Sequence, residues 1–162
     1  MILDSDKQIK QKIDAVLLQS ELSGFARIKA DVIARGVRTY YYLIQRREPE
    51  IPEYPSVVVA CAQNEENLYI GKTRHDIRRE QINGRLLEKL EERLGPYGGS
   101  TEFAPRCCIG HCAEPLAANK LLRREHVENI DDIYFGDAYR PRTGLIVAPC
   151  GNCVKTFNNV RK

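Results

Sequence analysis

Three cysteines have the spacing that is best suited to chemistry. Cys150 and Cys153 are three positions apart, so on one helical turn both sulfurs point to the same side. Pro149 precedes them, at a position where a helix can begin without wasting a backbone donor. Cys112 lies much earlier in the chain, also at an expected helix start. Free N–H groups at a helix N-terminus favour thiolate over thiol, so all three sulfurs are candidate metal ligands.

The number of these ligands indicates a catalytic rather than a structural metal. Three thiolates supply three corners of a tetrahedron and leave the fourth open, whereas a structural zinc has four protein ligands. Glu114 follows Cys112 by two residues and is expected beside the metal. A carboxylate within reach of a zinc-bound water can take its proton and pass it on. Hydrolytic loss of ammonia from an aromatic ring requires this combination of zinc and carboxylate.

At these residues the sequence resembles the cytidine deaminase-like superfamily. The segment CAE (112–114) followed by PCGNC (149–153) is similar to the zinc signature of nucleobase deaminases. The longer string GHCAEPLAANKLL (110–122) looks closer to the YwqJ-like deaminases, which are toxin domains of bacterial polymorphic toxin systems. The resemblance extends over about residues 56–158 at the level of the fold, and only the two zinc segments are specific.

This resemblance implies a set of roles and a reaction. Zinc would bind Cys112, Cys150 and Cys153, Glu114 would be the proton shuttle, and the backbone of Ala113 would contact the bound base. The implied reaction converts cytosine to uracil, preferably in a nucleic acid that is single-stranded or has the target base flipped out. Cysteine in the first ligand position leaves free cytidine, another nucleoside or a related small molecule as the alternative substrate. As a toxin domain, the chain would act in the cytoplasm of another cell and be blocked by an immunity protein.

The charge of the zinc site predicts a neighbouring arginine. Zinc with three thiolates carries a net charge of −1, which opposes ionisation of a bound water. A guanidinium hydrogen-bonded to a ligand sulfur would offset this charge. The arginines nearest to the ligands in sequence are Arg106, Arg140 and Arg142.

Two other interpretations of the cysteines remain open. A closed structural zinc knuckle would use a Cys3His set, namely Cys108, His111, Cys150 and Cys153. That interpretation makes the chain a non-catalytic binding module and gives Glu114 and Pro149 no role. The second alternative is a disulfide or a group of buried thiols.

Length and composition bound the fold. The chain has 162 residues, 43% of them hydrophobic and 29% charged, which fits one folded domain and excludes wholesale disorder. We expect no membrane partner, since no run of about 18 apolar residues occurs. The mixed charges of the first residues are unlike an export signal, so we expect reduced thiols. The net charge of +3 is too small to establish a nucleic-acid partner.

Hydrophobic periodicity and turn residues predict the elements that must position the site. We expect an N-terminal helical extension over 1–50, with helices at 5–20 and 24–42, joined by a proline-rich connector to a deaminase domain over 51–162. Within that domain we expect strands at 56–63, 67–73, 130–139 and 143–148, and helices at 76–94, 112–125 and 149–160. This order indicates an α/β layered domain. The resemblance implies a three-layer fold with a central mixed sheet, zinc-binding helix N-termini on one face and extra N-terminal helices. Only nine residues follow Cys153, whereas many relatives continue with further strands, so we expect the wall that those strands form to be missing here or to be supplied by the first fifty residues.

Overall fold

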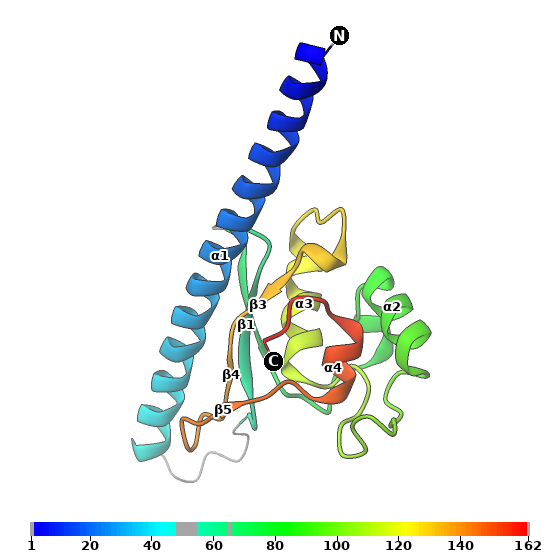
Figure 1. Cartoon of the computed structure of the whole chain (residues 1–162). Helices are drawn as coiled ribbons and strands as arrows, with labels where there is room; N and C mark the ends of the chain where they lie inside the picture. Colours follow the sequence, from blue (N-terminus) through cyan, green and yellow to red (C-terminus); the bar gives the residue numbers. More distant parts are fainter. Residues whose placement is uncertain (1, 48–54, 65, 162) are drawn as a thin grey trace.

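A five-stranded sheet lies between one long helix and a layer of shorter helices (Figure 1). The computed structural model describes residues 2–47, 55–64 and 66–161, so Pro49 and Pro52 of the expected connector lie outside the described residues. The helices are α1 (Ile2–Arg47), α2 (Gly84–Leu94), α3 (Ala113–Arg124) and α4 (Gly151–Thr156), with 3-10 turns η1 (Arg79–Gln81) and η2 (Ile130–Asp132). The strands are β1 (Val58–Ala62), β2 (Leu68–Lys72), β3 (Tyr134–Phe135), β4 (Ala138–Tyr139) and β5 (Ile146–Val147).

The sheet is antiparallel throughout the described strands, so the expected mixed sheet is wrong. Its order is β2-β1-β4-β5, and β3 pairs with β1 next to β4. The hairpin predicted from the sequence is confirmed, with Ala60 of β1 opposite Ile70 of β2. After α3 the chain returns on the other side of β1, where Cys61 pairs with Phe135. Strands β2 and β3 therefore run in the same direction but are separated by β1, and no parallel neighbours result.

Alternating residues of β1 face two different helical layers. Val59 and Cys61 belong to the core that α2, α3 and α4 form with the sheet, whereas Val58 and Ala60 pack against α1. All five residues of β1 are buried, as expected for a strand covered on both faces. The helices α2, α3 and α4 lie together on the side of the sheet opposite to α1 (Figure 1). This arrangement confirms three layers.

The N-terminal region is one continuous helix, so the expected pair of helices is wrong. Gly24 and Gly36 lie inside α1, where a glycine costs only about 1 kcal/mol relative to alanine and does not by itself end a helix. Residues with small side chains, Ala30 and Ala34, let α1 pack closely on the sheet. Among the described residues, no helix is both long and apolar enough to cross a membrane.

The helix predicted over 76–94 is shorter than expected, because Asn83 starts a new helix within it. The Asn83 side chain accepts hydrogen bonds from the backbone N–H groups of Arg85 and Leu86, at 3.1 and 3.3 Å. An asparagine in this capping position ends the preceding segment and orients α2 independently. The residues before it form only the short turn η1.

Gly71 determines how closely α3 approaches the sheet. A Cβ atom at Gly71 would overlap the carbonyl oxygen of Ala113 and the backbone nitrogen of Ala117. Because both are backbone atoms in a helix, neither can move away as a side chain would. The absence of a side chain at Gly71 therefore sets the position of the first turn of α3, which carries Cys112 and Glu114.

We expect Gly71→Ala to lower the free energy of unfolding by about 1–3 kcal/mol, the usual cost of overpacking. Thermal unfolding followed by circular dichroism measures this effect. Gly84→Ala is the matched control, because a Cβ there would meet no atom within 4 Å. Equal melting temperatures for the two variants would contradict the role of Gly71.

Candidate metal centre

The N-termini of α3 and α4 meet with their cysteines in contact. Cys112 is the N-cap of α3 and Cys150 is the N-cap of α4. Their Sγ atoms lie 3.5 Å apart, and Cys153 Sγ lies 3.7 Å from Cys150 Sγ. Zinc–sulfur bonds of about 2.3 Å in a tetrahedron place two sulfurs about 3.8 Å apart. The three cysteines predicted as ligands are therefore brought together, with two sulfur–sulfur distances that a shared metal ion could span.

The thiols of this group interact as one unit. Hydrogen bonds with Cys112 and Cys153, in that order of importance, lower the pKa of Cys150 to about 2. The backbone N–H groups of Asn152 and Cys153 lower it further, as expected at the start of a helix. The hydrogen bond with Cys150 raises the pKa of Cys112, and the bonds with Cys112 and Cys150 raise that of Cys153. Metal binding would replace the protons that the three sulfurs now share.

Glu114 lies directly beside the sulfurs. Its side chain is only 6% exposed, and Cys153 Sγ donates to Glu114 Oε2 at 3.4 Å. Burial, more than the nearby charge of Cys150, raises the pKa of this carboxyl. A raised pKa suits a group that must both accept and release a proton near neutral pH.

A fourth sulfur, that of Cys107, also reaches this centre. The Sγ atoms of Cys107, Cys112 and Cys150 all lie within 4.8 Å of one another. The Asn152 side chain holds the Cys107 segment to α4, since it donates to the Cys107 carbonyl at 3.5 Å and bonds Thr101 Oγ1. The only sequence signal for this position was the unusual adjacent pair of Cys107 and Cys108.

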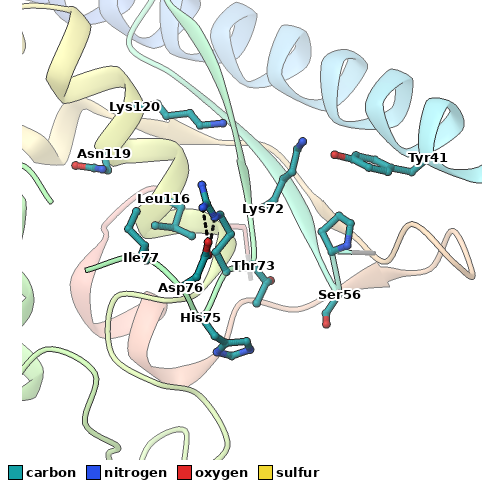
Figure 2. Close-up of a pocket in the computed structure, with 12 residues that line it drawn as sticks. Tyr41, Ser56, Lys72, Thr73, His75, Asp76, Ile77, Leu116, Asn119 and Lys120 are labelled. Atoms are coloured by element: carbon teal, nitrogen blue, oxygen red, sulfur yellow. Dashed lines mark hydrogen bonds and ion pairs between the residues drawn. The ribbon is translucent and has the colours of Figure 1, made fainter. Parts of the chain in front are cut away.

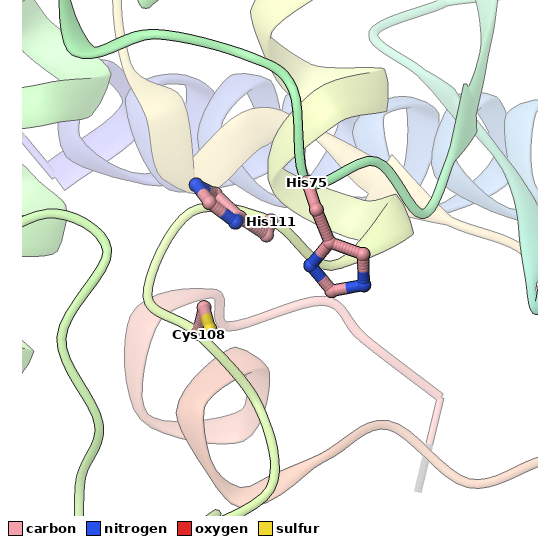
Figure 3. A group of neighbouring side chains, drawn as sticks. All are labelled: His75, Cys108 and His111. Carbon is pink, nitrogen blue, oxygen red and sulfur yellow. The ribbon is translucent and has the colours of Figure 1, made fainter.

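The Cys3His set of the alternative knuckle is not assembled as one group. Cys108 and His111 lie with His75 in a separate cluster, within 4.8 Å of one another (Figure 3). Within residues 2–47, 55–64 and 66–161, two groups of side chains could thus each hold a metal ion.

A cavity of about 290 Å³ lies next to Glu114. Phe135, Val147 and Pro149 give it apolar walls, and Asp137 and Arg161 contribute charge. Ligand cavities in proteins measure roughly 300–1,000 Å³, so this cavity has room for one small ring system.

Of the remaining predicted residues, the three arginines lie at the surface and Ala113 is buried. Arg106, Arg140 and Arg142 are exposed, and the contact between an arginine and a ligand sulfur stays a prediction. Ala113 is buried with its carbonyl against Gly71 of β2, so its contact with a base also stays a prediction.

A second, larger cavity carries positive charge. It measures about 550 Å³ and extends along α3 from the end of β2, where Lys72, Arg74 and Lys120 line it (Figure 2). Lys72 Nζ lies 4.9 Å from the centre of the Tyr41 ring, and Lys120 Nζ donates to the Ile70 carbonyl at 2.7 Å. Burial and then the charges of Lys72 and Arg74 lower the pKa of Lys120, which indicates crowding of cations.

No protein-family model, curated protein or solved structure matches this chain. What the centre offers is therefore judged from its own residues: three clustered sulfurs that could hold a metal ion, with a buried carboxyl in contact with one of them.

We expect Cys150→Ala to bind one zinc ion fewer per chain than the wild type, whereas Cys107→Ala retains that ion. The reason is that Cys150 contacts both other predicted ligands, while Cys107 approaches from a loop. Elemental analysis of dialysed protein measures the zinc content. Cys61→Ala is the control, because Cys61 is buried in β1 away from the cluster. Loss of zinc from Cys107→Ala as well would indicate a closed site with four sulfurs.

Proposed function

We propose that this chain is a zinc-dependent hydrolytic deaminase that converts cytosine to uracil, preferably in a nucleic acid. The observation that carries the proposal is the Glu114 carboxyl, 3.4 Å from Cys153 Sγ and next to sulfurs that fit a zinc tetrahedron. The antiparallel hairpin and the two cysteine-capped helices on one face also support a fold of the cytidine deaminase-like superfamily. Within that superfamily, the YwqJ-like toxin deaminases remain the proposed relatives.

Glu114 performs the proton transfers in the proposed reaction. Bound zinc would supply a Lewis acid that makes water a nucleophile at neutral pH. Glu114 accepts a proton from the water as its oxygen bonds to C4 of the ring, and delivers that proton to N3. A second transfer, from the attacking oxygen to the exocyclic amine, lets the C4–N bond break. Ammonia leaves and the C4 carbonyl of uracil remains.

The size of the cavity next to Glu114 supports a single base as the reacting group. Its volume of about 290 Å³ accommodates one ring, and Phe135 and Pro149 offer apolar contacts to it. A polymer would therefore have to present the target base alone, unpaired or flipped out of its stack.

The basic cavity supports the preference for nucleic acid over a free nucleoside. Lys72 and Lys120 face a space large enough for sugar and phosphate groups, and the Tyr41 ring lines the same space, whereas Arg74 is paired there with Asp76. Leu116 lines this cavity and lies one helical turn after Cys112 of the cysteine centre. Clustered cations beside an aromatic ring are typical of surfaces that bind single-stranded nucleic acid.

We expect Glu114→Gln to retain zinc and to lower ammonia release by about 10²–10⁴-fold, the usual contribution of an acid–base group. The amide keeps the size of the side chain but cannot shuttle a proton. Glu125→Gln is the control: Glu125 lies at the other end of α3, where it accepts a hydrogen bond from Tyr69. Undiminished ammonia release from Glu114→Gln would refute the assigned role.

The substrate class is tested with matched pairs of lysine variants. We expect Lys72→Gln with Lys120→Gln to lower conversion of cytosine in single-stranded oligonucleotides by about tenfold, since two phosphate contacts would be lost. Conversion of free cytidine should change little. Lys7→Gln with Lys10→Gln on the exposed part of α1 removes the same charge and is the control. Conversion of free cytidine alone by the wild type would favour the nucleoside alternative.

A non-catalytic zinc module is the second candidate function, because Cys107 lies close enough to the other sulfurs to act as a fourth ligand. If Cys107 occupies the fourth corner, no position is left for water and the centre becomes structural. The zinc content of Cys107→Ala distinguishes the two functions, since only the structural site needs this sulfur.

A further inference from the structure

The loop between Cys107 and Cys112 contributes side chains to two different clusters. Its outer residues, Cys107 and Cys112, lie with Cys150, whereas its inner residues, Cys108 and His111, lie with His75 (Figure 3). The second cluster takes no part in the proposed deamination. Its possible ligand atoms lie within 4.8 Å of one another, which a single bound metal ion can span.

The backbone of this loop presents Cys108 and His111 on the same side. The His111 N–H donates to the Cys108 carbonyl at 3.1 Å, which closes a tight turn. Gly110, the third residue of that turn, has a φ of 86°, a conformation that favours glycine. A Cβ at Gly110 would overlap the ring of Tyr97, so the turn is fixed by packing as well as by its hydrogen bond.

A separate segment brings His75 to the turn. The Arg74 N–H donates to the His111 carbonyl at 3.3 Å, which ties the chain after β2 to this loop. The centres of the His75 and His111 rings are 5.8 Å apart. The two residues that flank His75 in the sequence are also bonded to each other, since the Arg74 side chain donates to Asp76 at 2.7 and 2.9 Å.

His111 shows why packing alone does not account for the cluster. Among the described residues, neither Nδ1 nor Nε2 of His111 has a hydrogen-bond partner, although both atoms are buried. Buried polar atoms are nearly always satisfied, and an unsatisfied one is costly. Coordination of a metal ion by one ring nitrogen would satisfy that atom.

We propose that His75, Cys108 and His111 form a second metal site, which takes a divalent transition-metal ion of the zinc class. One thiolate with two imidazoles suits Zn²⁺ and its neighbours, whereas Mg²⁺ and Ca²⁺ require oxygen ligands. His75 is exposed, so solvent can complete the coordination. The bound ion links the segment after β2 to the loop that carries Cys107 and Cys112. This site stands independently of the proposed deaminase activity.

The test is the number of zinc ions bound per chain. We expect two for the wild type, one for His75→Ala and one for Cys108→Ala, measured by elemental analysis of protein dialysed against trace zinc. His126→Ala is the matched control, because His126 is the remaining histidine of the chain and is exposed. It should bind two ions. His75 is also exposed, so its removal should not prevent folding, which circular dichroism verifies.

Titration with Co²⁺ provides a second readout. Binding at the second site should add a thiolate-to-cobalt absorption band that His75→Ala and Cys108→Ala both lack and Cys150→Ala retains. Equal metal content and equal spectra for the wild type and His75→Ala would overturn the proposal. Ammonia release plays no part in this result, so failure of the second site and failure of the deaminase proposal are distinguishable.

Discussion

The cysteine centre depends on the meeting of two helix N-termini at one point. Cys112 and Cys150 are the N-caps of α3 and α4, and the first backbone N–H groups of α4 already favour the thiolate form of Cys150. Because α4 has only six residues, neighbouring contacts must determine its position. Gly151 provides one such contact, since a Cβ there would overlap the backbone of Phe103. The loops before α3 and α4 are thus part of the centre, and the loop before α3 also supplies the sulfur of Cys107.

Local patterns predicted the parts of the molecule that local interactions determine. The β1–β2 hairpin and the helices that begin after Cys112 and Cys150 follow from alternation, proline placement and three-residue spacing. The continuity of α1 was not predicted, because two glycines weakened the pattern while packing against the sheet could not be read from it. The proximity of Cys107 to the centre depends on the Asn152 side chain, a long-range contact that no spacing reveals.

An ion pair links the N-terminal helix α1 to a residue that lines the cavity beside Glu114. Arg161 lines that cavity and its Nη1 atom lies 3.0 Å from both Asp31 of α1 and Asp137. The nearly buried Asp31 also accepts the Asp137 N–H, so its charge is compensated by two partners. In this way α1 contacts a residue that lines the cavity, whereas the expectation that the first fifty residues supply a wall of the substrate site stays a prediction.

Gly71 is needed for the cysteine centre although it takes no part in its chemistry. This residue has no functional group, yet the placement of Cys112 and Glu114 relies on the room it leaves for the backbone of α3. Among divergent descendants of this chain, Gly71 should be as invariant as the cysteines themselves. A survey of invariant positions would then rank it with the reactive residues, even though its contribution is purely steric.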